Sequence, residues 1–334
     1  MANIGIIGAG TWGTALAIHL AKCCHHVTVW SHEEKEAALL SKNRKHPNLP
    51  DAKIPAAIRF TACEEEVCAD KSLLLFSVPS IFTRETARRM APYVPEGQRI
   101  VNVAKGIEET TLLTQSELTE QELPRMEVCV LSGPSHAEEV SIGMPTAVVA
   151  GAKRRETAEY IQNTFMSPAF RVYSSPDIKG IELGGSLKNV IALAAGMADG
   201  LGYGDNTEAA LVTRGMTEMG RLVSAMGCSM QTVYGLAGLG DLIVTCGSRH
   251  SRNRRAGVLI GQGYTAKAAM KEVQMVVEGV YSAKAAKQLA EKYQVEMPIV
   301  EEVNRILFEG KPAADAVMEL MCRDKTSEHP GLSW

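Results

Sequence analysis

Three glycines near the start of the chain constrain its fold more than any other feature. Gly8, Gly10 and Gly13 form a GxGxxG pattern directly after the apolar run 4–7 and before the apolar-periodic stretch 14–20. In a strand–turn–helix unit, the first glycine permits the tight turn and the second lets the backbone approach a pyrophosphate. The third lets the helix pack closely on the strand. We therefore expect an N-terminal Rossmann domain that binds NAD, NADP or FAD.

The adenosine end of the expected cofactor site falls at Ser31, His32 and Glu33. These residues follow the β-rich run 26–30 and lie about 20 residues beyond the glycines, where this fold positions the group that contacts the ribose. An acidic residue there favours NAD, whereas a basic residue accepts the extra phosphate of NADP. His32 followed by Glu33 indicates neither, so the choice between NAD(H) and NADP(H) stays open.

Further apolar runs extend the expected sheet. Residues 72–78, 99–103 and 127–131 are typical of buried strands, and a polar turn follows each of them. In open α/β sheets, ligands lie outside the carboxyl ends of the strands. Lys105 and the loop 133–135 are therefore expected near the cofactor.

The character of the chain changes near residue 176. Strand-like runs give way to long segments rich in Ala, Leu and Met with helical spacing, up to about residue 320. A chain of 334 residues is also too long for one ordinary core. We expect an α/β Rossmann domain with a mostly parallel, doubly wound sheet over residues 1–178, and an all-helical substrate domain over residues 179–334.

Composition argues against several classes of function. The chain has 35 Lys and Arg against 38 Asp and Glu, a net charge of −3, so no overall attraction to nucleic acid or an anionic membrane is expected. It has no charge-free apolar stretch of about 18 residues, so no membrane insertion is expected. The eight cysteines form no CxxC pair, and we predict neither a metal site nor disulfides. The N-terminus shows no targeting segment, which predicts a cytoplasmic protein.

Lys188 lies within the apolar segment 183–201, whose only other ionisable residue is Asp199. We expect this segment to be a central buried helix. Burial favours the neutral form of a lysine and brings its pKa toward neutrality, which suits a proton donor or acceptor in carbonyl reduction. A structural ion pair, or a lysine that extends to solvent from a helix end, explains Lys188 equally well. Asn189 is either a structural amide or one that orients a substrate.

The segment 238–255 joins one acidic residue to a basic run. Asp241 and Thr245 are one helical turn apart and would share a face. Arg252 and Asn253, at the start of a helix, would add side-chain donors to the free backbone N–H groups and form a phosphate site. The alternative is a solvated basic face. A nucleic-acid surface is disfavoured because no aromatic residues interleave with the arginines.

Six motifs follow one another along the chain: GAGTWGTALA (8–17), NVAKGIE (102–108), LSGPSHAEEV (131–140), ELGGSLKNVIALAAG (182–196), GLAGLGDLIVTC (235–246) and SRHSRNRRAG (248–257). With them the chain resembles the bacterial type of NAD(P)-dependent glycerol-3-phosphate dehydrogenase. The resemblance implies a Rossmann domain joined to a helical domain of the 6-phosphogluconate dehydrogenase-like type. It also implies reduction of dihydroxyacetone phosphate to sn-glycerol 3-phosphate, the precursor of glycerophospholipids.

The resemblance further implies roles for individual residues. Lys188 would be the acid/base, although Lys105 stays open as the proton donor. The implied catalytic residues are Lys188, Lys105, Asp241, Asn189 and Thr245. The implied substrate contacts are Lys105, Gly133, Ser135, Lys188, Asp241, Ser251, Arg252 and Asn253. The expected cofactor contacts are Gly8, Gly10, Thr11, Trp12, Gly13, His32, Lys105, Ala137, Arg252, Val276 and Glu278.

Two other functions stay open at this point. A related β-hydroxyacid dehydrogenase, of the 6-phosphogluconate or 3-hydroxyisobutyrate type, would act on a carboxylate instead of a phosphate. A non-enzymatic NAD(H)-sensing module would need no acid/base, and the lysine in the apolar segment 183–201 argues against it. The many Met and Ala residues of the helical half are compatible with a dimer face, and we expect a homodimer.

Overall fold

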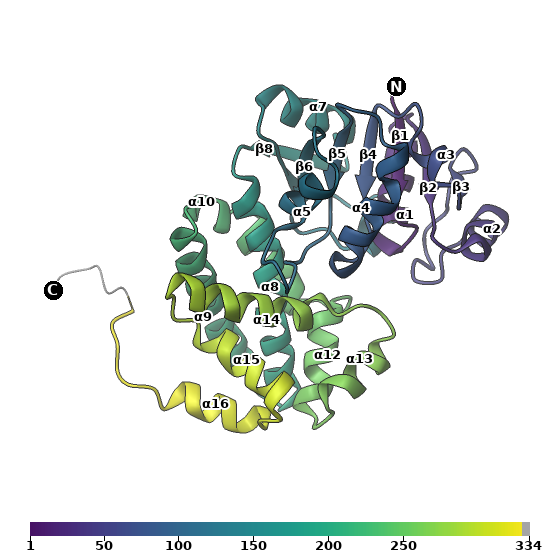
Figure 1. The fold of residues 1–334 in the computed structure, drawn as a ribbon. Helices are drawn as coiled ribbons and strands as arrows, with labels where there is room; N and C mark the ends of the chain where they lie inside the picture. The colour runs from purple at the N-terminus through teal and green to yellow at the C-terminus, as the bar shows by residue number, and fades with distance from the viewer. Residues whose placement is uncertain (329–334) are drawn as a thin grey trace.

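An eight-stranded sheet organises the first half of the chain in the computed structural model, which describes residues 1–328 (Figure 1). Its strands are β1 (Asn3–Ile7), β2 (His26–Trp30), β3 (Arg59–Thr61), β4 (Leu73–Phe76), β5 (Arg99–Asn102), β6 (Glu127–Ser132), β7 (Thr146–Gly151) and β8 (Phe170–Ser175). The strand order is β3-β2-β1-β4-β5-β6-β7-β8. Neighbouring strands are parallel except β6 and β7, which are antiparallel.

Helices cover both faces of this sheet. They are α1 (Thr11–Lys22), α2 (Glu34–Asn43), α3 (Glu64–Cys68), η1 (Ser80–Phe82), α4 (Thr83–Met90), η2 (Ala91–Tyr93), α5 (Gln115–Glu122), α6 (Ala137–Ile142) and α7 (Arg155–Phe165). Successive side chains of the central strand β4 enter different cores: Leu73 and Leu75 belong to one apolar cluster, and Leu74 and Phe76 to another. A strand buried on both faces is typical of a doubly wound sheet, and the predicted fold class is confirmed.

The second half of the described chain is helical. It consists of α8 (Ile178–Gly200), α9 (Asp205–Ala225), α10 (Met230–Val233), η3 (Leu236–Gly240), α11 (Asp241–Gly247), α12 (Arg252–Gly261), α13 (Ala266–Val273), α14 (Glu278–Tyr293), α15 (Pro298–Glu309) and α16 (Ala313–Met321). Figure 1 shows α8 running from the sheet into the middle of these helices. Nearly all of α8 is buried, and α12 approaches it closely, because a Cβ on Gly257 would lie only 2.3 Å from the carbonyl oxygen of Leu193.

The sequence prediction missed three strands, β3, β7 and β8. In β8, buried and exposed residues alternate and serines end the strand, so it lacks the continuous apolar run that marks the central strands. The predicted division into residues 1–178 and 179–334 stays a prediction; its last six residues lie outside the described part of the chain.

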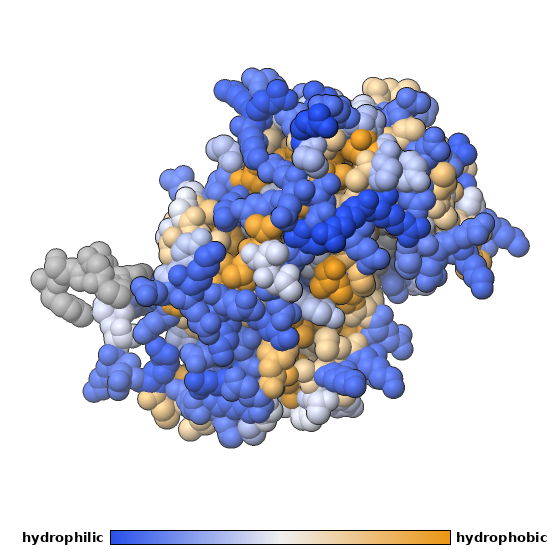
Figure 2. Space-filling model, in the orientation of Figure 1, coloured by the Kyte–Doolittle hydropathy of each residue, from blue (hydrophilic) through white to orange (hydrophobic). Residues whose placement is uncertain are grey.

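The surface drawn in Figure 2 is mainly hydrophilic, and its apolar side chains form small separate groups. Across residues 1–328, none of the helices has both the length and the apolar character needed to cross a bilayer.

Candidate active site

Two lysines and one aspartate form an ion cluster where the two halves of the chain meet. The Nζ atom of Lys105, in the loop after β5, lies 2.6 Å from Oδ2 of Asp241. The Nζ atom of Lys188, in the middle of α8, lies 3.0 Å from Oδ1 of the same carboxylate. Asp241 is the first residue of α11 and is buried. One carboxylate therefore bridges two ammonium groups, one from each half.

Thr245 completes the cluster from the next turn of α11. Its hydroxyl accepts a hydrogen bond from Lys188 Nζ at 2.6 Å and donates to the carbonyl oxygen of Asp241 at 2.6 Å. Asp241 and Thr245 thus share a face of the helix, as their spacing predicts.

The environment of this cluster shifts the pKa values of Lys188 and Asp241. Lys188 is only 6% exposed. Its burial lowers its pKa to about 8, with the charge of Asp241 opposing this shift and that of Lys105 adding to it. Burial alone would raise the pKa of Asp241, but the two lysines hold it below its usual value. A lysine that titrates near neutral pH can give up and regain a proton during turnover.

These contacts decide between the two structural alternatives for Lys188. It lies in the interior of α8 and not at a helix end, so the idea of a lysine extending to solvent is wrong. The ion pair exists, and it is compatible with a proton-transfer role because burial keeps the lysine pKa low.

The loop after β6 reaches the same cluster. Lys105 Nζ donates to the carbonyl oxygen of Gly133 at 3.0 Å and lies 3.5 Å from Oγ of Ser135. The structure therefore brings Lys105, Gly133 and Ser135 together, and Lys105 connects them to Asp241. Their roles toward a substrate stay predictions.

Two asparagines link this cluster to the start of α12 and α14. Asn189 donates from Nδ2 to the carbonyl oxygens of Lys105 and Gly185, both at 3.3 Å. Asn253 donates from Nδ2 to Oδ1 of Asn189 at 2.8 Å and accepts from the backbone N–H of Gly279 at 2.9 Å. Both side-chain amides therefore have protein partners and fix the backbone around Lys105.

The predicted phosphate site lies at the N-terminus of α12. Ser251 is the N-cap, and its Oγ accepts the backbone N–H of Arg254 at 3.1 Å. Arg252 donates from Nη1 to the carbonyl oxygen of Val276 at 3.0 Å, which uses one of its five N–H donors. Arg254 pairs with Asp199 at 2.6 Å. The basic run thus combines a structural arginine, Arg254, with a helix N-terminus that can take an anion.

The glycine-rich turn has the shape and the unused groups that a dinucleotide needs. Gly8 has a φ of +118°, and a Cβ on Gly13 would lie 2.0 Å from the carbonyl oxygen of Gly8. A Cβ on Gly10 would meet nothing within 4 Å. Within residues 1–328 the buried hydroxyl of Thr11, the first residue of α1, has no hydrogen-bond partner. Open space at Gly10 beside unused donors at a helix N-terminus fits a pyrophosphate.

The remaining predicted cofactor contacts are spread around this edge of the sheet. Trp12 packs at the start of α1, and Ala137 is the buried first residue of α6. Glu278 begins α14 and bonds to Ser80. His32 is different, because its side chain is largely exposed beyond β2 and lies 3.6 Å from Glu33. The structure does not bring His32 into contact with the lysine cluster.

Three residues at this junction were given no role in the sequence analysis. Ser80, in the segment after β4, donates hydrogen bonds to Glu278 of the other half; the sequence places Ser80 at the cofactor edge but does not indicate this partner. His136, the N-cap of α6, lies with its ring centre 5.9 Å from that of His250, before α12. Burial lowers the pKa of His136. Nothing local in the sequence pairs these two histidines.

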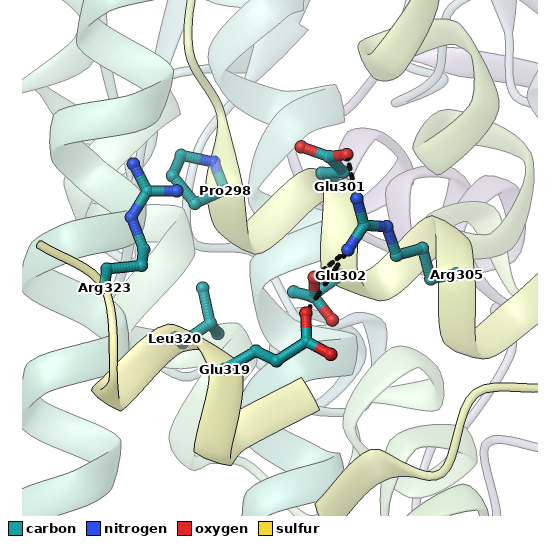
Figure 3. A pocket seen from close by; sticks show the side chains of 7 residues that line it. All are labelled: Pro298, Glu301, Glu302, Arg305, Glu319, Leu320 and Arg323. Carbon is teal, nitrogen blue, oxygen red and sulfur yellow. Dashed lines mark hydrogen bonds and ion pairs between the residues drawn. The ribbon is translucent and has the colours of Figure 1, made fainter. Parts of the chain in front are cut away.

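A separate surface hollow of about 150 Å³ lies in the helical half (Figure 3). It is lined by Pro298, Glu301, Glu302, Arg305, Glu319, Leu320 and Arg323. Arg305 pairs with three glutamates there, and none of the predicted site residues lines it. We assign no chemistry to this hollow. Residues 1–328 also contain no group of three or more His, Cys, Asp or Glu side chains arranged to hold a metal ion.

Comparison with known proteins agrees with this arrangement. The family models for the N-terminus and the C-terminus of NAD-dependent glycerol-3-phosphate dehydrogenase match residues 3–158 and 177–318. Two similar curated proteins are named glycerol-3-phosphate dehydrogenase (NAD(P)+). The one from Agathobacter rectalis is 61% identical over the full length of both chains. The one from Fusobacterium nucleatum subsp. nucleatum is 55% identical over 98% of this chain and 99% of its own.

A solved structure is also similar over nearly the whole chain. The crystal structure of glycerol-3-phosphate dehydrogenase from Coxiella burnetii has a TM-score of 0.91 and 39% sequence identity. The match covers 96% of this chain and 99% of that one. The sheet-containing half and the helical half of this chain therefore both have counterparts in that one crystal structure.

Proposed function

Because this chain belongs to the family of NAD-dependent glycerol-3-phosphate dehydrogenases, we propose that Lys105, Lys188 and Asp241 form its catalytic centre. The protein is an oxidoreductase that reduces dihydroxyacetone phosphate to sn-glycerol 3-phosphate with a nicotinamide cofactor. One observation carries the catalytic proposal: a lysine with a pKa of about 8 is buried against a carboxylate at the junction of the two halves.

NAD(H) or NADP(H) would bind along the carboxyl ends of the strands, with its pyrophosphate at the glycine-rich turn. When bound, the reduced nicotinamide supplies the hydride. The open space at Gly10 and the unused hydroxyl of Thr11 support this location. The proposed contacts are Gly8, Gly10, Thr11, Trp12, Gly13, His32, Lys105, Ala137, Arg252, Val276 and Glu278.

Lys188 would give its proton to the substrate oxygen as the carbonyl becomes an alcohol. Its burial supports this role, because a desolvated ammonium with a pKa of about 8 is a stronger acid than an exposed one. Lys105 is more exposed than Lys188, and its positive charge would polarise the same oxygen. Reduction therefore needs the charged form of Lys188, and the reverse oxidation needs the neutral amine.

The substrate phosphate would lie at the N-terminus of α12. The N–H groups of this helix, together with the donors of Arg252 that Val276 does not use, can hold a dianion. Asn253 lies in the first turn of α12, and Asn189 follows Lys188 in α8. The hydrogen bond between these two asparagines therefore connects the proposed phosphate site to the lysines. Ser251 would act chiefly through its cap on α12.

The phosphate proposal can be tested by comparing two substrates in Arg252→Ala. With dihydroxyacetone phosphate, the KM should rise about 10- to 100-fold, because one charge-assisted contact contributes about 1.5–3 kcal/mol. With unphosphorylated dihydroxyacetone as the matched control, and with the cofactor saturating because Arg252 is also a proposed cofactor contact, the slow turnover should stay near that of the wild type. Loss of nicotinamide absorbance measures both. An unchanged KM for the phosphorylated substrate would contradict the proposal, and an equal loss on both substrates would point to the cofactor instead.

The two alternative functions fit this chain less well. A β-hydroxyacid dehydrogenase is disfavoured because both halves of the chain match the family models of glycerol-3-phosphate dehydrogenase. An NAD(H) sensor would have no use for two lysines held on one buried aspartate.

We also propose that the protein is a cytoplasmic homodimer that supplies glycerophospholipid synthesis. Several large apolar side chains of the helical half are exposed, and their burial in an interface would be favourable; they are Tyr234, Ile243, Phe308, Met318 and Met321. Sedimentation velocity at micromolar concentration tests the dimer, and a single monomeric species would contradict it.

A further inference from the structure

Ser80 joins the two halves of the chain at the edge of the proposed active site. It is the first residue of η1, in the segment that follows β4, and is 6% exposed. Its backbone N–H donates to Oε1 of Glu278 at 2.9 Å, and its hydroxyl donates to Oε2 of the same carboxylate. Glu278 is the first residue of α14 and is 9% exposed. Both oxygens of this carboxylate are therefore occupied by one serine of the other half.

The same serine packs directly against the residue that follows Lys105. A Cβ built on Gly106 would lie 2.2 Å from Oγ of Ser80 and 2.4 Å from its Cβ. The backbone at Gly106 and the side chain of Ser80 are thus in contact with no room between them. Any displacement of Ser80 leaves the backbone next to Lys105 without that support.

A chain of hydrogen bonds leads back from Glu278 to Lys105 on the other side. The neighbour of Glu278, Gly279, donates its N–H to Asn253, which donates to Asn189, which donates to the carbonyl oxygen of Lys105. With the contact between Ser80 and Gly106, these bonds close a ring. We call these residues the junction ring: Ser80, Lys105, Gly106, Asn189, Asn253, Glu278 and Gly279.

We propose that Ser80 is a positioning residue that, through Glu278 and the junction ring, holds the backbone at Lys105 where its ammonium meets Asp241. The flexible side chain of Lys105 has four rotatable bonds, so the position of its Nζ depends on a fixed backbone. Within the ring, Asn189 holds the carbonyl oxygen of Lys105 and Ser80 packs on Gly106. Outside the ring, Gln115 donates from its side chain to the carbonyl oxygen of Gly106 at 3.2 Å. The inference rests on the proposed role of Lys105.

The chain contains a second serine–glutamate clamp that serves as a matched control. Ser116 donates its N–H to Oε1 of Glu182 at 2.7 Å and its hydroxyl to Oε2 at 2.5 Å. Both residues are buried, and they join α5 to α8 across the same junction. The chemistry and burial match those of Ser80 and Glu278. Ser116 and Glu182 are not part of the junction ring; the neighbouring Gln115 donates to the carbonyl oxygen of Gly106, and Ser116→Ala leaves that side chain unchanged.

The test compares Ser80→Ala with Ser116→Ala in the full-length enzyme. We expect Ser80→Ala to lower kcat about tenfold, which corresponds to about 1.4 kcal/mol in the barrier, with little change in the KM for dihydroxyacetone phosphate. The two variants should lower Tm by similar amounts, because each loses one buried hydroxyl. In Ser116→Ala, however, kcat should stay within about twofold of the wild type. A wild-type kcat in Ser80→Ala, or equal losses of kcat in both variants, would overturn the proposal.

A second measurement covers the case in which Ser80→Ala is too unstable to assay. Glu278→Gln keeps the side-chain volume and weakens the same clamp. By itself, at saturating cofactor, Glu278→Gln should lower kcat in the same way as Ser80→Ala, and a wild-type kcat in this variant would contradict the proposal. Where both single variants are stable, the loss of kcat in the double variant should be smaller than the two single losses combined, because both act through one contact. Additive losses would refute the clamp. Lys105→Ala separates the two proposals: if this variant keeps its turnover, the role of Lys105 is wrong, whatever Ser80 does.

Discussion

Replacing Asp241 with asparagine tests the electrostatics of the catalytic centre directly. The change keeps the shape of the side chain and removes the one negative charge that both lysines share. Lys188 Nζ lies 3.0 Å from this carboxylate. At that distance the attraction is about 5 kcal/mol with an effective dielectric constant of about 20. This energy corresponds to a change of roughly four units in the pKa of Lys188, before the surrounding structure and solvent relax.

The structure fixes the direction of the effect. Asp241 raises the pKa of Lys188 against burial and against the charge of Lys105. Without the charge of Asp241, burial and the charge of Lys105 both lower the pKa of Lys188, so this lysine loses its proton at a lower pH. The proton-donating form needed for reduction should then disappear on the alkaline side, with a limb near pH 8 in the wild-type enzyme. Allowing for relaxation, we expect this limb to move down by about two pH units in Asp241→Asn.

The assay is the pH dependence of kcat/KM for dihydroxyacetone phosphate, followed through nicotinamide absorbance at saturating cofactor. At pH 7.5 the variant should be at least about tenfold slower than the wild type, because little Lys188 stays protonated. Asp205→Asn is the matched control, since Asp205 is exposed in the first turn of α9. The oxidation of sn-glycerol 3-phosphate should show the opposite limb, rising through the same pH. If the alkaline limb of kcat/KM for reduction in Asp241→Asn lies within about 0.3 pH units of the wild-type limb, the reasoning is refuted.

Two further substitutions separate catalysis from stability. Lys188→Ala should lower kcat by about a hundredfold or more, because it removes the proton donor, while NADH affinity measured by fluorescence titration stays near that of the wild type. A kcat close to the wild-type value would remove Lys188 from the mechanism. Glu218→Ala should lower the free energy of unfolding by about 2 kcal/mol in a urea titration, because buried Glu218 accepts the N–H groups of Ile299 and Val300 at the start of α15. Its kcat should stay unchanged, and Glu301→Ala on the exposed face of α15 should change neither property.

Local sequence patterns predicted the parts of this protein that local physics determines. The glycine-rich turn depends on backbone conformation and close approach at Gly8 and Gly13, which only glycine provides. The long buried helix α8 follows from an apolar segment with one lysine. The edge strand β8 was missed because its exposed positions interrupt the apolar run.

Pairings across the junction could not be predicted in the same way. Ser80 and Glu278 are 198 residues apart, and each has an ordinary sequence context. Nothing in the segment 77–82 indicates that a carboxylate from α14 will accept hydrogen bonds from both the backbone N–H and the hydroxyl of Ser80. The predicted contacts Asn189, Asn253 and Glu278 carry hydrogen bonds to the protein, and only the assembled fold shows these partners.

The geometry of Asp241 limits what this residue can do in the reaction. Each of its two oxygens faces a lysine ammonium, at 3.0 Å and 2.6 Å. As an ionised carboxylate, Asp241 can only accept hydrogen bonds and has no proton to give to the substrate. Its pKa is also held below the ordinary value, which makes it a poor base. Asp241 therefore acts through its charge: it keeps two ammonium groups close together and keeps Lys188 protonated at neutral pH. This is why the substitution that removes only its charge is the sharpest test of the site.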